Sequence, residues 1–171
     1  LDRGTRRVDL AAVRTVLDKI CGLEVTKHLQ YAAPSAELPP LSPDKAERIL
    51  DHCHTDSERL LILLLTELSL RPGQITHLRY RDFYPEDSLV VLMERTKGRG
   101  FIMAVPDEVM TLVRQVQGDA PGTECLFAAR GNSRLPMSVR GLEKRVERIG
   151  LRCDIAATCT SLQKAESILD H

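Results

Sequence analysis

Arg71, at the end of a leucine-rich run that reaches Leu70, is a residue that could bind a phosphate. It is followed at once by Pro72 and Gly73, so one predicted helix stops here and another starts. A guanidinium is a rigid planar fork that matches a phosphate, and a helix end braced by buried leucines would keep that fork in place. The alternative interpretation is an arginine that interacts favourably with the helix dipole, which is the more common case for a single residue of this kind.

Lys97 is a second candidate, because it lies in the segment RTKGRG between two β-rich runs, SLVVLME and GFIMAVP. Gly98 and Gly100 supply turn chemistry, and the sequence therefore predicts a β-hairpin with this lysine near its tip. A lysine in such a turn is usually solvated or protects a strand edge. A flexible lysine beside a glycine also has the reach to touch a ligand, and Arg95 and Arg99 near it could add phosphate contacts.

A third basic group lies on the predicted helix 139–149, which Ser138 would cap. Its members are spaced by about three to four residues and are expected to share one helical face: Arg140, Lys144, Arg145 and Arg148. Such a face suits the backbone of a duplex. Because Glu143 and Glu147 are interspersed, an ordinary solvated face is an equally good interpretation of the charge pattern.

Helices and strands must position these basic groups, and the hydrophobic periodicity of the sequence predicts that most of these elements are helices. The predicted elements after the first helix are a helix opened by Ser42, Pro43 and Asp44, a helix over 56–70, a helix over 73–80, the β-hairpin, a helix over 107–116, the basic helix and a short helical pattern near 162–169. The predicted fold class is therefore α+β, mostly helical, with a small antiparallel sheet.

The clearest boundary in the chain is the segment YAAPSAELPPLSP, rich in Pro, Ala and Ser. A helical pattern precedes it and stops at Gly22. We expect residues 1–22 to end a preceding helical domain, 23–41 to be a linker and 42–171 to be one further domain. The chain starts Leu-Asp-Arg, without an initiator Met, which indicates a piece of a longer protein.

The bulk composition favours a globular domain without a membrane span, since apolar residues make up 43% and charged residues 28% of the chain. The formal net charge is zero, which is compatible with a basic face balanced elsewhere. Five cysteines form no CxxC pair, so reduced thiols are predicted. His52, Cys53 and His54 point in different directions on a helix and lack a second ligand pair, so no metal site is expected.

The order of these blocks resembles the catalytic domain of the tyrosine recombinases, the phage integrase family. The segment LSLRPGQITHLRYRDF is similar to the family's TGLRISELLALRWSDID, which places Arg71 on the first catalytic arginine. Lys97 falls on the catalytic lysine of the hairpin. The segment CLFAARGNSRLPMSVRGLEKRVERIG looks like the next block, and CTSLQKAESILDH is similar to the terminal HSSLQTTERYLDH. The likeness covers roughly residues 42–171.

The resemblance implies the DNA breaking-rejoining fold and a domain that binds double-stranded DNA. An intact member cleaves and rejoins DNA through a 3′-phosphotyrosine, without metal, ATP or another cofactor. The lysine would protonate the leaving 5′ oxygen. The residues it implies for DNA contact are Arg79, Arg95, Arg99, Arg140, Lys144 and Arg145. It also implies self-association on DNA, no membrane partner and a place in the cytoplasm at the nucleoid.

The chain departs from this pattern where the chemistry should occur. Ile168 occupies the position of the nucleophilic tyrosine, and Cys159 that of a histidine. Arg152 is either the second catalytic arginine or the end of the basic helix, in which case the His-x-x-Arg block is missing; the second interpretation is favoured. Gln74 replaces an acidic residue. The chain is a degenerate member, an edited one, or one that lacks a segment near Ala157.

We therefore predict a recombinase-type domain that is inactive as written. A non-catalytic DNA-binding or regulatory protein on the same fold is the alternative. A helical interaction domain with no nucleic-acid role is a third possibility, in which the leucine-rich helix is core and the charges are ordinary surface. Salt-dependent binding to duplex DNA separates the third from the first two.

Overall fold

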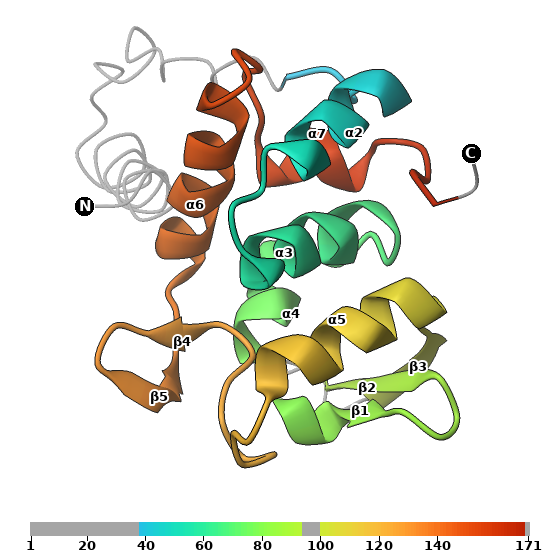
Figure 1. The fold of residues 1–171 in the computed structure, drawn as a ribbon, viewed down its shortest axis with the longest axis vertical. Coiled ribbons are helices and arrows are strands. Elements are labelled where there is room, and N and C mark those ends of the chain that lie inside the picture. Colours follow the sequence, from blue (N-terminus) through green and yellow to red (C-terminus); the bar gives the residue numbers. More distant parts are fainter. Residues whose placement is uncertain (1–37, 94–99, 170–171) are drawn as a thin grey trace, which may run out of the picture. The chain divides into compact units, whose positions relative to one another are not determined.

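The leucine-rich helix α3 (Asp56–Thr66) lies among the other helices at the centre of the core (Figure 1). The computed structural model describes residues 38–93 and 100–169, which belong to the second of two units, Glu37–His171. Six consecutive residues of α3, Leu60–Leu65, are completely buried. A helix that is apolar all round must be covered on all sides, and α2, α5 and α7 pack against this one.

The sequence places most of the remaining helices correctly. They are α2 (Pro43–Asp51), α4 (Pro72–His77), α5 (Asp107–Gln117), α6 (Val139–Leu151) and α7 (Cys159–Gln163), with a 3-10 turn at Tyr80–Asp82. The predicted helix over 56–70 ends four residues early. Ser69 there has a positive φ of 48°, which no right-handed helix can contain, and this break separates α3 from α4.

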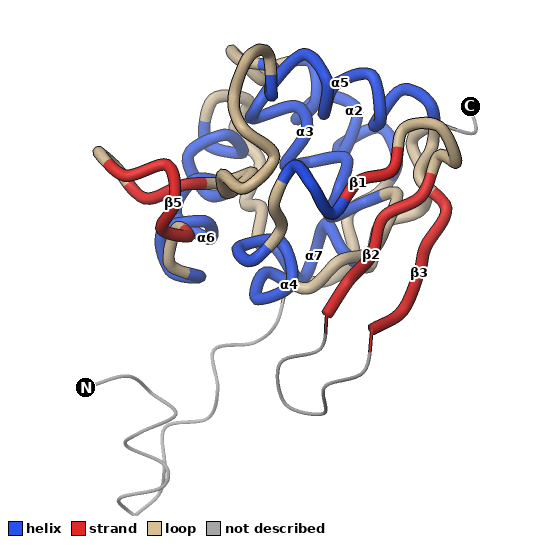
Figure 2. The backbone as a smooth tube through the Cα atoms, turned by 90° about the horizontal axis from the view of Figure 1, so that it is seen from below, coloured by secondary structure: helices blue, strands red, loops and turns tan. Residues whose placement is uncertain are grey.

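A three-stranded antiparallel sheet confirms the predicted hairpin. Its strands are β1 (Phe83–Tyr84), β2 (Leu89–Met93) and β3 (Gly100–Ala104), in the order β1-β2-β3, and Met93 pairs with Gly100 (Figure 2). The tip of the hairpin, 94–99, lies outside the described residues. So do most of the predicted linker and the helix that precedes it.

A second, two-stranded sheet was not predicted. It consists of β4 (Ala128–Ala129) and β5 (Asn132–Pro136), which we call the β4–β5 ribbon. Four of the five β5 residues are exposed, so the apolar–polar alternation that reveals a half-buried strand is missing. The predicted fold class is nevertheless confirmed: the described part is mostly helical with small antiparallel sheets. No helix in it is long and apolar enough to cross a membrane.

Candidate functional site

Arg71 lies at the junction of α3 and α4, as the N-cap residue of α4. Its backbone N–H donates to Oε1 of Gln74 at 2.8 Å, so the glutamine fixes the first turn of α4. Leu70 beside it is 2% exposed and anchors the junction in the core. The Arg71 side chain is exposed and forms no ion pair with any carboxylate among the described residues. The geometry therefore presents a charged fork to solvent from a fixed backbone.

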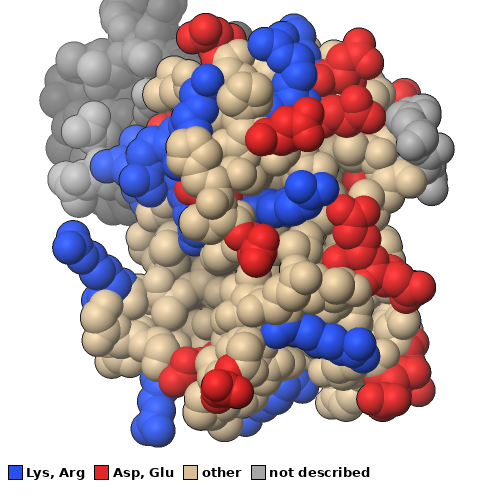
Figure 3. Space-filling view, viewed as in Figure 1, with Lys and Arg blue, Asp and Glu red and all other residues tan. Residues whose placement is uncertain are grey.

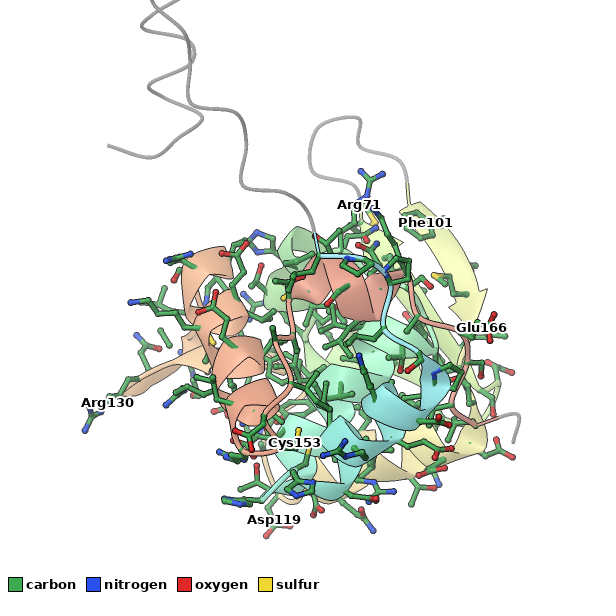
Figure 4. All side chains as sticks on the ribbon, turned by 90° about the horizontal axis from the view of Figure 1, so that it is seen from above. Arg71, Phe101, Asp119, Arg130, Cys153 and Glu166 are labelled. Atoms are coloured by element: carbon green, nitrogen blue, oxygen red, sulfur yellow. The ribbon has the colours of Figure 1, made fainter. Side chains whose placement is uncertain are left out.

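The β2–β3 hairpin ends beside this junction. Gln74 of α4 and Met93 of β2 line a common hollow of about 180 Å³. Figure 4 shows Arg71 and Phe101, the second residue of β3, on the same side of the molecule. The described base of the hairpin thus lies on the same side of the molecule as Arg71 (Figure 4). Lys97, Arg95 and Arg99 themselves lie outside the described residues, so their roles stay predictions.

Arg79 lines the same hollow as Gln74 and is hydrogen-bonded to neighbouring residues. Its Nη1 donates to the carbonyl of Thr123, and its backbone N–H donates to Oδ2 of Asp82 at 2.8 Å. An isolated β-bridge also joins Arg79 to Cys125. These contacts fix the loop before β4 against the start of the 3-10 turn. The side chain lines the hollow beside Gln74, and its assignment to DNA stays a prediction.

The basic residues of α6 do not all share one face. Arg145 lies over the ring of Phe127, with Cζ 5.9 Å from the ring centroid, and its Nη2 donates to Oγ of Ser57 at 3.2 Å. Burial lowers the pKa of this guanidinium. Arg140, Lys144 and Arg148 are exposed, and Arg140 pairs with nearby Glu143 at 3.7 Å. Since successive helical residues turn by about 100°, residue 145 points inward where its neighbours point outward.

Arg152 is engaged by a carboxylate. Its Nη1 and Nη2 donate to Oε2 and Oε1 of Glu58 at 2.6 and 3.0 Å, and Nη1 also donates to the carbonyl of His52 at 3.2 Å. The hydrogen bond from Arg152 is the main reason why the pKa of Glu58 falls to about 2. The backbone N–H of His54 adds a further bond to Oε2 at 2.9 Å. This arrangement ties the end of α6 to the start of α3, and the catalytic assignment of Arg152 stays a prediction.

The C-terminal segment packs on the end of α3. Ile168 is 6% exposed, and its N–H donates to Oε1 of Glu67 at 2.8 Å. Oγ of Ser167 donates to Oε2 of the same carboxylate at 2.5 Å, and Nε2 of Gln163 donates to the Ser69 carbonyl at 2.7 Å. The position predicted for the nucleophile is therefore filled by a buried apolar side chain.

The four described cysteines are buried or half-buried. All four are free thiols, and no cluster of three potential metal ligands occurs among the described residues. Burial raises the pKa of Cys159 to about 12 and that of Cys53 to about 11. Thiols of this kind are protonated and unreactive near neutral pH. Cys159, in the place of a predicted histidine, therefore behaves as a core residue.

The sequence interpretation passed over two exposed arginines on the β4–β5 ribbon. Arg130 is at its turn and Arg134 is on β5, and neither pairs with a carboxylate of the described residues. The signal that could have revealed them is the pattern of two arginines around a glycine just before the basic helix.

The chain matches one protein family, and the solved structures that resemble it share one fold. The family model described as the phage integrase family matches residues 40–163. No curated protein sequence matches the chain. Among solved structures, the integrase from mycobacterium phage Brujita has a TM-score of 0.64 at 14% identity, covering 90% of this chain and 52% of its own length. The XerA recombinase gives 0.64 at 15%, with 91% and 65% covered.

A lambda integrase dimer bound to a COC′ core site is also similar, with a TM-score of 0.62 at 13% identity, covering 90% of this chain and 46% of that one. At such identities the likeness shows a shared fold. The chain spans about half to two-thirds of the length of these three proteins.

Proposed function

The chain belongs to the phage integrase family of tyrosine recombinases, and on this premise we propose that it binds the backbone of duplex DNA with a phosphate at Arg71. The main support for the proposal is that the backbone of Arg71 is fixed while its side chain is exposed. A buried leucine-rich helix and a Gln74 cap fix its backbone, while its guanidinium is exposed and unpaired among the described carboxylates. Preorganised donors of this kind are what phosphoryl transfer requires.

The position of the β2–β3 hairpin base supports the proposal that Lys97 contacts the same phosphate as Arg71. Lys97, between the paired ends Met93 and Gly100, would approach from the hairpin side. In an intact member, a tyrosine hydroxyl attacks the phosphorus, forms a 3′-phosphotyrosine and expels the 5′ oxygen, which takes a proton from the lysine. Two cations at one phosphodiester would stabilise the charge that develops on its non-bridging oxygens.

We further propose that this chain binds DNA without cleaving it. Ile168 has no hydroxyl and is buried against the end of α3, and the last tyrosine in the sequence is Tyr84. Arg152 is paired with Glu58 and would have to leave that carboxylate to contact a phosphate. A non-catalytic DNA-binding role on the recombinase fold is the function that these contacts favour.

Fluorescence anisotropy with a labelled duplex tests the proposal. The chain should bind with an affinity that falls steeply as salt rises, because phosphate contacts release counterions. Arg71→Ala should weaken binding about tenfold, since a charge-assisted hydrogen bond contributes about 1.5 kcal/mol or more. Arg114→Ala on α5, which removes the same charge from an exposed site, is the matched control. Equal effects of the two substitutions, or no salt-dependent binding, would contradict the proposal.

A suicide substrate, a duplex nicked so that cleavage releases a short strand, tests the absence of catalysis. We expect no covalent protein–DNA adduct on a denaturing gel at any protein concentration. An adduct that survives denaturation would show that another residue acts as nucleophile and would overturn the assignment.

A further inference from the structure

The turn that joins α3 to α4 contains a strained residue. Ser69 has a φ of 48°, in the left-handed region that residues with a Cβ rarely adopt. Its side chain is exposed, so the packing of that side chain does not explain the conformation. Its two neighbours, Leu68 and Leu70, are 4% and 2% exposed. The strained backbone thus lets both leucines enter the core across a sharp turn.

Arg71 follows this strained position by two residues. If the φ of Ser69 relaxed from 48° to an ordinary helical value of about −63°, the chain beyond it would turn by roughly 110°. Such a rotation would carry the backbone of Arg71, and with it the exposed guanidinium, into another orientation. The direction of Arg71 therefore depends on the conformation of Ser69, and strain of this kind persists only where surrounding contacts hold it.

Gln163, the last residue of α7, provides such a contact. Its Nε2 donates to the carbonyl of Ser69 at 2.7 Å, across 94 residues of sequence. Its neighbour Leu162 is completely buried, and α7 packs against α3, so the amide is presented from a fixed helix. From the α3 side, the N–H of Leu70 donates to the carbonyl of Leu64 at 3.1 Å. The strained turn is thus held from two sides, one of them distant in sequence.

The residues that follow α7 bind the same turn at a second point. The N–H of Ile168 and Oγ of Ser167 donate to the two carboxylate oxygens of Glu67, which precedes Ser69 by two residues. Of these contacts from the C-terminal part of the chain, the one that Gln163 makes is the one that touches the strained residue. Gln163 is therefore the side chain whose loss would release Ser69 most directly.

We propose that Gln163 is a positioning residue for the phosphate site. Through its bond to the Ser69 carbonyl, it keeps the α3–α4 turn in the conformation in which Arg71 points outward, as Figure 4 shows. The inference rests on the proposed function, because it takes Arg71 as the residue that binds a DNA phosphate. Gln163 itself does not touch the phosphate and acts through the backbone of Ser69.

The surroundings of Gln163 favour this indirect role over a direct contact with DNA. Its amide already donates to the Ser69 carbonyl. Figure 3 shows mainly acidic side chains along the edge of the molecule at which Figure 1 places the C-terminus, and Glu166 follows Gln163 by three residues. Negative charge of this kind repels a phosphate backbone. An effect of Gln163 on DNA binding is therefore expected to pass through Arg71.

The size of the effect follows from the equilibrium between two conformations of the turn. A ligand that binds only one conformation has an apparent dissociation constant that rises as the population of that conformation falls. The net contribution of one hydrogen bond in a folded protein corresponds to a change of about threefold to tenfold in such an equilibrium. Loss of the bond from Gln163 should weaken phosphate binding at Arg71 by a factor in this range.

Anisotropy of a labelled duplex with the variant Gln163→Met tests the inference. Methionine keeps the length and neutrality of the side chain but removes the donor, so binding should weaken about threefold to tenfold. Gln117→Met is the matched control, because Gln117 is the last residue of α5 and its Nε2 donates to the carbonyl of Ala120 at 3.1 Å. This control removes a bond of the same kind far along the chain from Ser69 and should leave the affinity unchanged.

Two double variants give a result that a general loss of stability would not. Glycine adopts a positive φ at little cost, so in the Ser69→Gly background the turn depends less on Gln163. Adding Gln163→Met to Ser69→Gly should therefore weaken binding by less than twofold. In the Arg71→Ala background, Gln163→Met should have no further effect, because two changes that act through one contact are not additive.

Four results would overturn the inference: an unchanged affinity of Gln163→Met, an equal loss for Gln117→Met, the full loss in the Ser69→Gly background, or the full loss in the Arg71→Ala background. The last result would show that Gln163 affects DNA binding by a route other than Arg71. If the unaltered chain shows no salt-dependent binding to duplex DNA, the proposed function itself fails, and this inference fails with it.

Discussion

Replacing Glu58 with glutamine should destabilise the fold by a predictable amount and with a predictable dependence on pH. Glu58 accepts two hydrogen bonds from Arg152, at 2.6 and 3.0 Å, and one from the N–H of His54 at 2.9 Å. Its side chain is 11% exposed, whereas that of Arg152 is 29% exposed. The substitution keeps the shape of the side chain but removes the charge that the ion pair with Arg152 requires.

The size of the effect follows from the pKa of Glu58, which lies at about 2 instead of 4.5. A difference of this size corresponds to about 3 kcal/mol of stability at neutral pH. Because solvent reaches this ion pair from the arginine side, the realised value should be smaller, at about 2 kcal/mol.

The sign of the pH dependence is fixed by the direction of the shift. A carboxyl group with a lowered pKa in the folded state stabilises the protein above its unfolded pKa of 4.5. This contribution is lost as the pH falls from 4.5 towards 2, where the carboxylate is protonated in both states. The difference in unfolding free energy between the unaltered chain and Glu58→Gln should thus be constant from pH 5 to 8 and shrink in acid.

Urea denaturation at pH 7 and pH 3, followed by circular dichroism, measures both quantities. Glu108→Gln is the matched control, since Glu108 pairs with Arg59 at 3.3 Å with both side chains more than 40% exposed. It should cost less than about 1 kcal/mol, as surface pairs do. If Glu58→Gln costs no more than the control, or if its deficit is the same at pH 3, the carboxylate does not hold α6 to α3 as described.

Two further predictions concern close packing and the C-terminal segment. Gly150→Ala should destabilise the fold by about 1–3 kcal/mol, because a Cβ there would lie 2.5 Å from the backbone carbonyl oxygen of Ile155. Gly73→Ala is the control: a Cβ at that position meets no other atom within 4 Å, so the substitution should leave the unfolding free energy unchanged in the same urea measurement. Glu67→Ala should speed amide hydrogen exchange at Ile168, whose N–H would lose its acceptor; an unchanged rate would show that the segment is fixed by apolar packing alone.

The fold was largely predictable because its main signals are local. The apolar run of α3, the Pro at the start of α2 and of α4, and the two β-rich segments around a glycine-containing turn each specify one element through nearby residues. The β4–β5 ribbon gave no such signal. Its strands are short and mostly exposed, and they are fixed by contacts of Cys125 and Phe127 that periodicity does not report.

The candidate site was predictable only in part, because charge and spacing do not specify what a side chain faces. Arg145 belongs to the same three-to-four spacing as Lys144, yet it turns toward Phe127 and Ser57. The partner of Arg152, Glu58, is 94 residues away in the sequence. Interactions over such a separation are formed by tertiary packing, so a local pattern could not distinguish these cations from those that face solvent.

Three arginines of identical chemistry thus have three different environments, and the environment sets how readily each could bind an anion. Arg152 is neutralised by a carboxylate, and a phosphate would have to displace Glu58 to reach it. Arg145 has exchanged part of its hydration for an aromatic ring and a hydroxyl. Among the described residues Arg71 has neither kind of partner, so no carboxylate or ring of that part of the chain would have to be displaced by an incoming phosphate. Of the three, the cation at the α3–α4 junction therefore has the smallest desolvation and rearrangement cost for binding an anion.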